Sequence, residues 1–173
     1  QAEHDPDAGA FLVTTSEKQA KKVADRIKML VPELPRKEII EASFKNRSAI
    51  ILANDLEEIF EVVNELAPEH LEILTKKPFD DLYRIRNAGA IFLGPNTPEP
   101  VGDYFAGPNH TLPTSGCAKF SSPLGVQDFV KTSSVISYSA ERLKNQGEQI
   151  IRFAEEEELF SHAAAIQTRL DNF

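Results

Sequence analysis

The sequence predicts an α/β fold, with a mostly parallel sheet, followed by a helical C-terminal tail. Short apolar or β-branched runs alternate with amphipathic helical stretches over roughly the first half of the chain. Strands that alternate with helices in this way favour a parallel sheet. Towards the C-terminus the apolar residues recur at helical spacing instead. We therefore expect an α/β domain at residues 1–122 and a mainly helical tail at residues 123–173.

Each element of the α/β part follows from a local pattern. Residues 10–15 form a short β-branched run that favours a strand, and Ser16 is a good N-cap for the helix that follows. That helix continues at regular apolar spacing until Pro32 and Pro35 close it. The same criteria predict a helix at 37–45, a strand at 49–53, a helix capped by Asn54 or Asp55 that reaches Leu66, a strand at 71–75, a helix at 78–87 and a buried strand at 88–94.

The chain changes character after Gly94. Residues 95–125 are crowded with Pro, Gly, Asn, Ser and Thr, and such long irregular stretches are usually functional or disordered. Residues 135–138 are a candidate last strand. Ser139 is expected to cap a helix that reaches Ala154, and a final helix is expected from about Ser161.

Composition excludes several classes of function. The chain has 173 residues and a net charge of -8, which argues against binding to nucleic acid or to an anionic membrane. No apolar run approaches the roughly 20 residues of a membrane-spanning helix. The single cysteine, Cys117, cannot form an intrachain disulfide and has no assigned role, so we expect a reducing, cytoplasmic location, or a plastid in a plant. The chain opens at Gln1 and its only methionine is Met29, so we expect that an upstream part has been removed.

The candidate chemistry lies in the four histidines. There is no G-x-G-x-x-G, P-loop, C-x-x-C, H-E-x-x-H or G-x-S-x-G motif, which argues against P-loop enzymes, zincin proteases and α/β-hydrolases. Each histidine has a carboxylate or amide nearby in the sequence. The pairs are Gln1 with His4, Glu69 with His70, Asp103 with His110, and Glu157 with His162.

Two of these pairs lie where the expected elements end. Glu69 and His70 follow Pro68 at a helix end, where they could serve as a water-activating partner and a general base, or simply as a solvated helix end. Asp103 and His110 follow the expected strand at 88–94. Ligand sites in open α/β sheets lie beyond the carboxyl ends of strands. This position makes these two residues stronger site candidates than an average loop residue.

The other two pairs lie near the chain ends. Gln1 and His4 would share a face if helical, although a frayed polar terminus is the plainer interpretation. Glu157 and His162 are five residues apart, so only a helix break around 159–161 could bring them together. Amide, imidazole and carboxylate groups from Gln1, His4, Asp103 and His162 would suit Zn²⁺, but the spacing does not show that they converge.

Several motifs together resemble the histidinol dehydrogenase family. Gln1-Ala-Glu-His-Asp-Pro resembles the family's S-Q-A-E-H-x-P segment. The resemblance covers essentially the whole chain in the family's order. It also includes Asn64-Glu-Leu-Ala-Pro-Glu-His-Leu-Glu72, Arg86-Asn-Ala-Gly-Ala-Ile-Phe-Leu-Gly94, Gly102-Asp-Tyr-Phe-Ala-Gly-Pro-Asn-His-Thr-Leu-Pro-Thr114, Phe120-Ser-Ser-Pro-Leu124 and Ser134-Val-Ile-Ser-Tyr-Ser139.

The resemblance implies roles for the histidines and their neighbours. It makes Glu69 and His70 the acid/base pair, and it implies substrate contacts for the zinc ligands and for His70 as well. The implied zinc ligands are Gln1, His4, Asp103 and His162, and the implied further substrate contacts are His110 and Glu157. It also implies an incomplete Rossmann-like layer.

The family reaction oxidises L-histidinol through L-histidinal to L-histidine with two NAD⁺. The resemblance further implies a homodimer in which Glu157 and His162, on the tail, complete the neighbour's site. A family chain is more than twice as long, and the portion absent here is N-terminal and includes the NAD-binding domain and a substrate-binding serine. The alternatives are a non-catalytic α/β binding or assembly module that keeps the motifs, and an unrelated acidic regulator, which the density of motifs disfavours.

Overall fold

The computed structural model describes all 173 residues, as two compact units, Gln1–Phe129 and Val130–Phe173. The first unit holds every strand, and the second holds two helices. No helix in either unit combines the length and the apolar character needed to cross a membrane.

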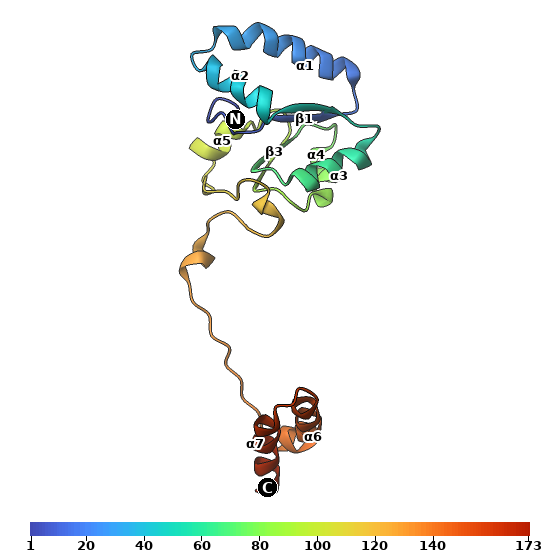
Figure 1. Cartoon of the computed structure of the whole chain (residues 1–173), viewed down its shortest axis with the longest axis vertical. Coiled ribbons are helices and arrows are strands. Elements are labelled where there is room, and N and C mark those ends of the chain that lie inside the picture. The colour runs from blue at the N-terminus through green and yellow to red at the C-terminus, as the bar shows by residue number, and fades with distance from the viewer. The chain divides into compact units, whose positions relative to one another are not determined.

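The first unit begins with a parallel strand pair and the helices that cover it. Strand β1 (Phe11–Thr14) pairs with β2 (Ala49–Leu52), with Phe11 opposite Ala49. Two helices connect these strands, and they lie on one side of the pair while α3 lies on the other (Figure 1). The connecting helices are α1 (Glu17–Leu30) and α2 (Lys37–Asn46), joined by a 3₁₀ turn at Val31–Glu33, and α3 spans Leu56–Leu66.

A second parallel pair completes the unit. Strand β3 (His70–Ile73) pairs with β4 (Ala90–Leu93), and His70 stands opposite Ala90. The parallel arrangement predicted from sequence is confirmed, but the four strands form two separate pairs and not one continuous sheet. Each crossover carries helical turns, as expected for parallel strands.

The predicted helix starts are confirmed in atomic detail. The Ser16 hydroxyl oxygen accepts the backbone N–H of Gln19 at 3.2 Å, and Asp55 accepts that of Glu58 at 2.9 Å. At the start of the C-terminal helix, Ser139 accepts the N–H of Arg142 at 3.1 Å. Each side chain satisfies a donor that the helix itself cannot pair.

The helix predicted at 78–87 ends early. Helix α4 covers Pro78–Asp81 only, and a 3₁₀ turn at Leu82–Arg84 follows. The cause is the buried side chain of Asn64, whose Oδ1 accepts the backbone N–H groups of Arg86 at 2.6 Å and Asn87 at 3.1 Å. Its Nδ2 donates to the carbonyl of Arg84 at 2.9 Å. These bonds replace helical hydrogen bonds and hold residues 84–87 in an extended turn beside α3.

A short helix lies within the stretch expected to be irregular. Helix α5 (Glu99–Tyr104) starts after Pro98, with Pro100 in its first turn, where a missing N–H costs nothing. Gly102 of α5 faces the ring of Phe92 on β4: a Cβ added there would come within 2.6 Å of the ring. Only glycine allows α5 to pack this close to β4.

The second unit is a pair of packed helices, α6 (Ala140–Glu156) and α7 (Phe160–Asp171). Gly147 makes this packing close, because a Cβ there would lie 2.7 Å from Leu170. The strand predicted at 135–138 is wrong. Val135 is 93% exposed, and no partner strand lies beside residues 135–138. The β-branched residues of this segment therefore have no strand to pair with.

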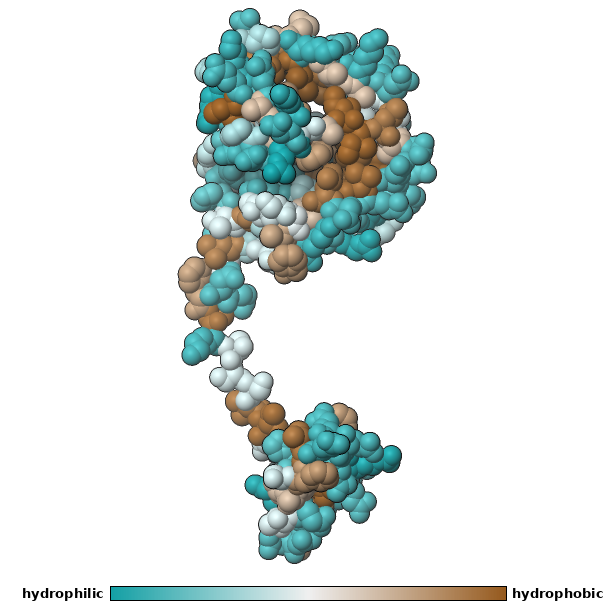
Figure 2. Space-filling view, in the orientation of Figure 1, coloured by the Kyte–Doolittle hydropathy of each residue, from teal (hydrophilic) through white to brown (hydrophobic).

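The first unit leaves much apolar side-chain surface exposed, among it Phe11 at 46% and Leu52 at 54%. An apolar groove runs along α1 and the strands β1 and β2, lined in part by Val23, Ile27 and Phe44. Apolar residues gather visibly on the face of this unit shown in Figure 2. The buried hydrophobic side chains of this unit include Phe60, Val63, Ile73 and Phe92. One cluster of buried residues is built around Ala2, Val31 and Ile40.

Candidate functional site

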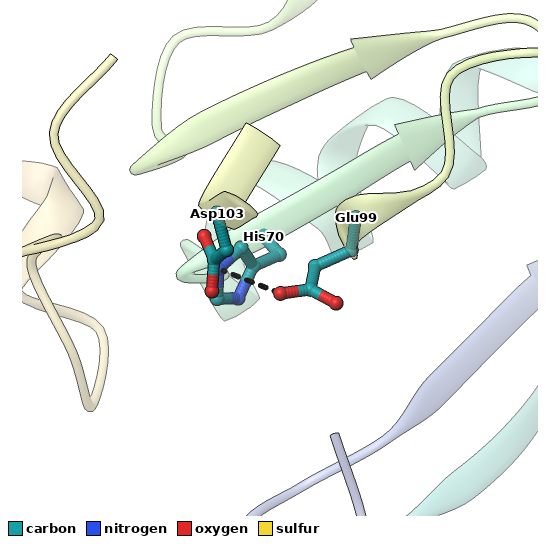
Figure 3. Close-up of side chains that lie close together, drawn as sticks. All are labelled: His70, Glu99 and Asp103. Atoms are coloured by element: carbon teal, nitrogen blue, oxygen red, sulfur yellow. Dashed lines mark ion pairs between the residues drawn. The ribbon is translucent and has the colours of Figure 1, made fainter. Parts of the chain in front are cut away.

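A histidine between two carboxylates forms the centre of the candidate site. The Nε2 atom of His70 lies 3.7 Å from Oδ1 of Asp103 and 3.8 Å from Oε1 of Glu99. Figure 3 shows the three side chains converging at one point, His70 from β3 and both carboxylates from α5. The candidate ligand atoms of all three lie within 4.8 Å of one another.

The backbone explains why these side chains meet. Glu99 and Asp103 are four residues apart on α5, so their side chains lie on one face of that helix. The N-terminus of α5 is fixed to β3, because the backbone N–H of Glu99 donates to the carboxylate of Glu72 at 3.0 Å. The contact between Gly102 and Phe92 holds the rest of α5 against β4. Two strands and one short helix therefore position the cluster.

The strand that carries His70 is anchored by a close backbone approach. The N–H of Gly89 donates to the carbonyl of Pro68 at 2.9 Å, and the N–H of Ala90 donates to that of Glu69 at 2.8 Å. A Cβ on Gly89 would come within 2.6 Å of the Glu69 carbonyl oxygen, so glycine is required there. The ring of His70 also packs beside that of Phe92, with ring centroids 6.0 Å apart.

The imidazole is buried and has no hydrogen bond at Nε2. The His70 side chain is only 9% exposed, whereas Glu99 and Asp103 are 19% and 20% exposed. Nε2 is the single buried side-chain nitrogen or oxygen without a hydrogen-bond partner in the structure. The carboxylates are within ion-pair range but beyond hydrogen-bonding distance. A buried polar atom of this kind calls for a ligand, a water molecule or a proton-transfer role.

The two acids influence each other. Burial, and then the hydrogen bond and charge of Asp103, raise the pKa of Glu99 above its ordinary value. The charge of His70 and the α-amino group of Gln1 act in the opposite direction, and burial and Asp103 prevail. Two carboxylates in one half-buried place resist holding two negative charges.

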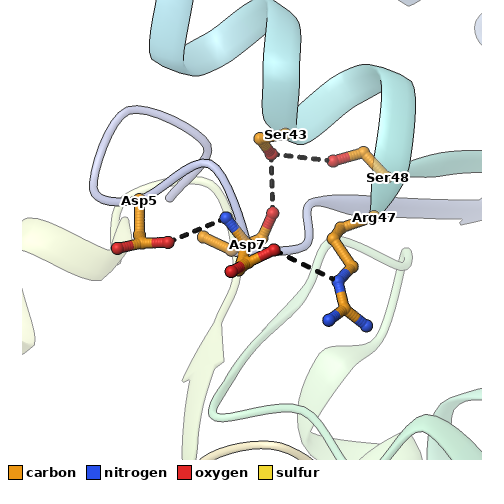
Figure 4. A network of polar contacts seen from close by, with 6 residues as sticks. Asp5, Asp7, Ser43, Arg47 and Ser48 are labelled. Carbon is orange, nitrogen blue, oxygen red and sulfur yellow. Dashed lines mark hydrogen bonds and ion pairs between the residues drawn. The ribbon is translucent and has the colours of Figure 1, made fainter.

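The N-terminal segment is held in place by a polar network. Ser43 on α2 is fully buried, and its hydroxyl donates to the carbonyl of Ala8 at 2.6 Å and lies 3.2 Å from the hydroxyl of Ser48 (Figure 4). Ser48 in turn accepts the N–H of Ala10 at 3.0 Å. An exposed ion pair joins Asp7 and Arg47 at 3.8 Å. Residues 7–10 are thereby fixed against α2.

The predicted zinc ligands are only partly brought together. Gln1 and His4 lie in one turn, in which the N–H of His4 donates to the carbonyl of Gln1 at 3.1 Å, and both residues are exposed. Buried Ala2 between them packs in the cluster with Val31 and Ile40. Asp103 belongs to the histidine–carboxylate cluster, whereas His162 lies on the second unit.

The chemistry of the donors present fits a divalent metal. Asp103 offers a half-buried carboxylate beside the unpartnered Nε2 of His70, and the N-terminal turn of the same unit carries an amide and an imidazole. Imidazole and carboxylate oxygen are common zinc ligands. The predicted set of four therefore suits zinc by donor type, and three of its members belong to the first unit.

The remaining predicted residues divide between the two units. Glu69 is half-buried directly before β3, but its side chain has no hydrogen bond or ion pair with His70. His110 is exposed in the loop after α5. In the second unit, Glu157 and His162 line one open groove between α6 and α7. A helix break does separate the two residues, slightly before the predicted 159–161: α6 ends at Glu156 and α7 starts at Phe160.

Glu99 is the member of the cluster that the sequence analysis missed. The spacing of Glu99 and Asp103 places them on one face only if residues 99–104 are helical. The signal was present in Pro98-Glu99-Pro100, since proline is favoured in the first turn of a helix and acidic residues are favoured there too. The richness of this region in Pro and Gly concealed it.

Fold and cluster together define an α/β protein with a histidine–carboxylate site of the kind that enzymes use for proton transfer or metal binding. A sequence model described as histidinol dehydrogenase matches residues 1–170. The chain belongs to the histidinol dehydrogenase family, an oxidoreductase family of histidine biosynthesis.

Individual relatives agree with this assignment. The chain is 55% identical over 172 residues to a histidinol dehydrogenase of Halalkalibacterium halodurans and 51% identical over 172 residues to one of Helicobacter hepaticus. Each match covers 99% of this chain, but only 41% and 39% of the relative. A crystal structure of histidinol dehydrogenase from Elizabethkingia anophelis superposes with a TM-score of 0.87 at 33% identity, covering 99% of this chain and 39% of that one. The chain thus spans about two fifths of the length of these relatives.

Proposed function

We propose that this chain supplies the metal-binding and acid/base part of a zinc-dependent, NAD-linked histidinol dehydrogenase, which oxidises L-histidinol through L-histidinal to L-histidine. The observation that carries the proposal is the buried, unpartnered Nε2 of His70, 3.7 Å from Asp103. It occurs in a chain that matches the family over residues 1–170. A free imidazole nitrogen in a half-buried site can accept a proton from an alcohol.

In this proposal His70 is the general base. Its Nε2 would take the proton of the substrate hydroxyl and later that of the hydrated aldehyde. Asp103 and Glu99 would stabilise the imidazolium that forms, because both carboxylates lie within 4 Å of Nε2. Glu69, next to His70, would activate the water that adds to the aldehyde carbon. His110 and Glu157 would contact the substrate.

Gln1, His4, Asp103 and His162 would hold the zinc ion. When bound, zinc would orient the imidazole and amino groups of L-histidinol. NAD would accept the hydride and would bind outside this chain. Because His162 and Glu157 belong to the second unit, we propose that they complete the site of a partner subunit in a homodimer. The α/β domain at 1–122, the helical tail at 123–173 and a cytoplasmic location stay predictions.

The proposal is tested by zinc binding in the presence of L-histidinol. Equilibrium dialysis of the purified chain should give bound zinc that is lost in His4→Ala and in Asp103→Asn. The matched control is Asp25→Asn, an exposed carboxylate on α1 without an ion pair. If His4→Ala and Asp103→Asn bind zinc as tightly as the unaltered chain, the ligand set is wrong.

A second candidate function is a non-catalytic α/β binding or assembly module. The exposed apolar groove along α1, β1 and β2 favours it. This alternative predicts that L-histidinol has no influence on the zinc content of the chain, whereas the enzymatic proposal predicts an increase. NADH production from L-histidinol by the chain alone would instead show that the NAD site is not elsewhere.

A further inference from the structure

We infer that Phe92 is a positioning residue for the proposed base, His70, because its ring lies against both the imidazole and the helix that carries Asp103. The inference rests on the proposed function, since it takes His70 as the base. Phe92 has no polar atom with which to take part in proton transfer. It therefore acts through its two neighbours and not on the substrate.

The first contact of Phe92 is with the imidazole. Phe92 on β4 stands opposite Glu72 on β3, two residues beyond His70, so Phe92 and His70 lie on the same face of the strand pair. Diagonal neighbours of this kind are within reach of aromatic side chains. The two ring centroids are 6.0 Å apart and the rings are tilted by 38°, an arrangement in which aromatic rings pack favourably. Phe92 is only 6% exposed, so its ring has little room to move.

The second contact of Phe92 is with α5. A Cβ added to Gly102 would lie 2.6 Å from Cε1 of the Phe92 ring and 2.9 Å from its Cζ, so the ring lies directly against the helix backbone. Gly102 immediately precedes Asp103, whose Oδ1 lies 3.7 Å from Nε2 of His70. One buried ring therefore packs against both elements whose side chains face each other in the site.

Packing has to hold the imidazole, because no hydrogen bond does so at its reactive nitrogen. Nε2 of His70 lacks a hydrogen-bond partner and faces the carboxylates of Asp103 and Glu99 (Figure 3). Contacts of 3.7 Å and 3.8 Å do not fix the direction of a ring as hydrogen bonds would. Beside a smaller side chain at position 92, the imidazole could turn about its Cα–Cβ bond into a second staggered rotamer. The proposed base would then face away from the proton that it has to accept.

Substitution by Leu and by Met isolates what the ring contributes. Both side chains keep position 92 apolar, and Met is unbranched and adaptable enough to fill an irregular space, but neither offers a flat, rigid face. Phe60 on α3 allows a matched control, because it is 5% exposed and its ring packs under the guanidinium of Arg84. Phe60→Leu therefore removes an equally buried ring that forms no aromatic pair with His70.

The test is NMR spectroscopy of the purified, isotope-labelled chain without added ligand. Three-bond couplings across the Cα–Cβ bond of His70 report the rotamer of its side chain. We expect the couplings of a single rotamer in the unaltered chain and in Phe60→Leu, and averaged couplings in Phe92→Leu and Phe92→Met. Urea unfolding curves show whether each variant is folded, and Phe92→Met decides the matter if Phe92→Leu does not fold.

Binding of L-histidinol by the zinc-loaded chain connects the rotamer with the proposed function. Phe92→Leu should bind L-histidinol at least about tenfold more weakly and Phe60→Leu within about twofold of the unaltered chain, since misplacement of a group by about 1 Å can cost about 100-fold. If the unaltered zinc-loaded chain binds no L-histidinol, the proposed function fails, and the couplings alone decide whether Phe92 positions His70.

Four results would overturn the inference. The unaltered chain could already show averaged couplings for His70, or both Phe92 variants could keep the single rotamer. Phe60→Leu could lose the single rotamer as well, which would make the effect one of general loosening. Finally, both Phe92 variants could bind L-histidinol as tightly as the unaltered chain does.

Discussion

Gly102 of α5 lies so close to Phe92 of β4 that a Cβ on the glycine would come within 2.6 Å of the aromatic ring. The next residue along α5 is Asp103, whose carboxylate faces His70. The absence of a side chain at Gly102 thus sets the distance between a helix and a strand, and with it the geometry of the candidate site.

We predict that Gly102→Ala destabilises the first unit. The added methyl group must push α5 away from Phe92, and overpacking of this kind costs about 1–3 kcal/mol. Urea denaturation measures this loss in the free energy of unfolding. Gly125→Ala is the control, because the nearest atom to its added Cβ is 3.9 Å away, and we expect a change within about 0.5 kcal/mol. Equal stability of the two variants would contradict the packing argument.

The side chain of Asn64 gives a second prediction. Asn64→Ala removes the partner of the N–H groups of Arg86 and Asn87 and of the Arg84 carbonyl, so part-buried backbone groups lose their hydrogen bonds. We expect a loss of about 1–3 kcal/mol in the free energy of unfolding. Exposed Asn46 on α2 has no side-chain hydrogen bond, so Asn46→Ala should be close to neutral. If Asn64→Ala is equally mild, the turn is held by other contacts.

How well these features could be predicted depends on the range of the interactions involved. Ser16, Asp55 and Ser139 act within three residues of their own position, and the sequence identified Ser16 and Ser139 as caps and placed the third at Asn54 or Asp55. Asn64 binds backbone groups of residues more than 20 positions away, and no local sequence pattern predicts these hydrogen bonds. For that reason the predicted helix at 78–87 was too long.

The residues of the candidate site also differ in how well they could be predicted from local sequence. His70 and Asp103 were candidates from local sequence and from the resemblance, but their approach to 3.7 Å depends on α5 packing against β4. Glu99 was missed because its pairing with Asp103 needs a helix in a region rich in Pro and Gly. The wrong strand at 135–138 shows the converse, because strand-forming residues without a partner strand stay unpaired.

Ser43 provides a prediction about the N-terminal segment. Ser43→Ala removes the donor to the Ala8 carbonyl, at a cost of about 1 kcal/mol, and should loosen the segment that carries Gln1 and His4. Hydrogen exchange should therefore become faster at Ala10, whose backbone N–H donates a hydrogen bond to the Ser48 hydroxyl. Ser121→Ala, at an exposed serine without a side-chain hydrogen bond, should leave exchange at Ala10 unchanged. An unchanged rate in Ser43→Ala would show that the network does not hold the segment.

The raised pKa of Glu99 predicts a pH-dependent stability. A carboxyl group whose pKa is higher in the folded than in the unfolded chain opposes folding once the pH exceeds its unfolded value. Glu99→Gln should therefore increase the free energy of unfolding at pH 7. The gain should vanish at about pH 3, where the carboxyl is protonated in both states. Denaturation curves at both pH values measure it, and an equal gain at the two values would contradict the electrostatic cause.

The central claim is that this chain carries the metal and acid/base residues of a histidinol dehydrogenase. Calorimetric titration of L-histidinol into the zinc-loaded chain, compared with the chain in EDTA, tests it most directly. We predict binding with zinc, none in EDTA, and loss of binding in His4→Ala. Binding of equal strength with and without zinc, or no binding in either case, would contradict the claim.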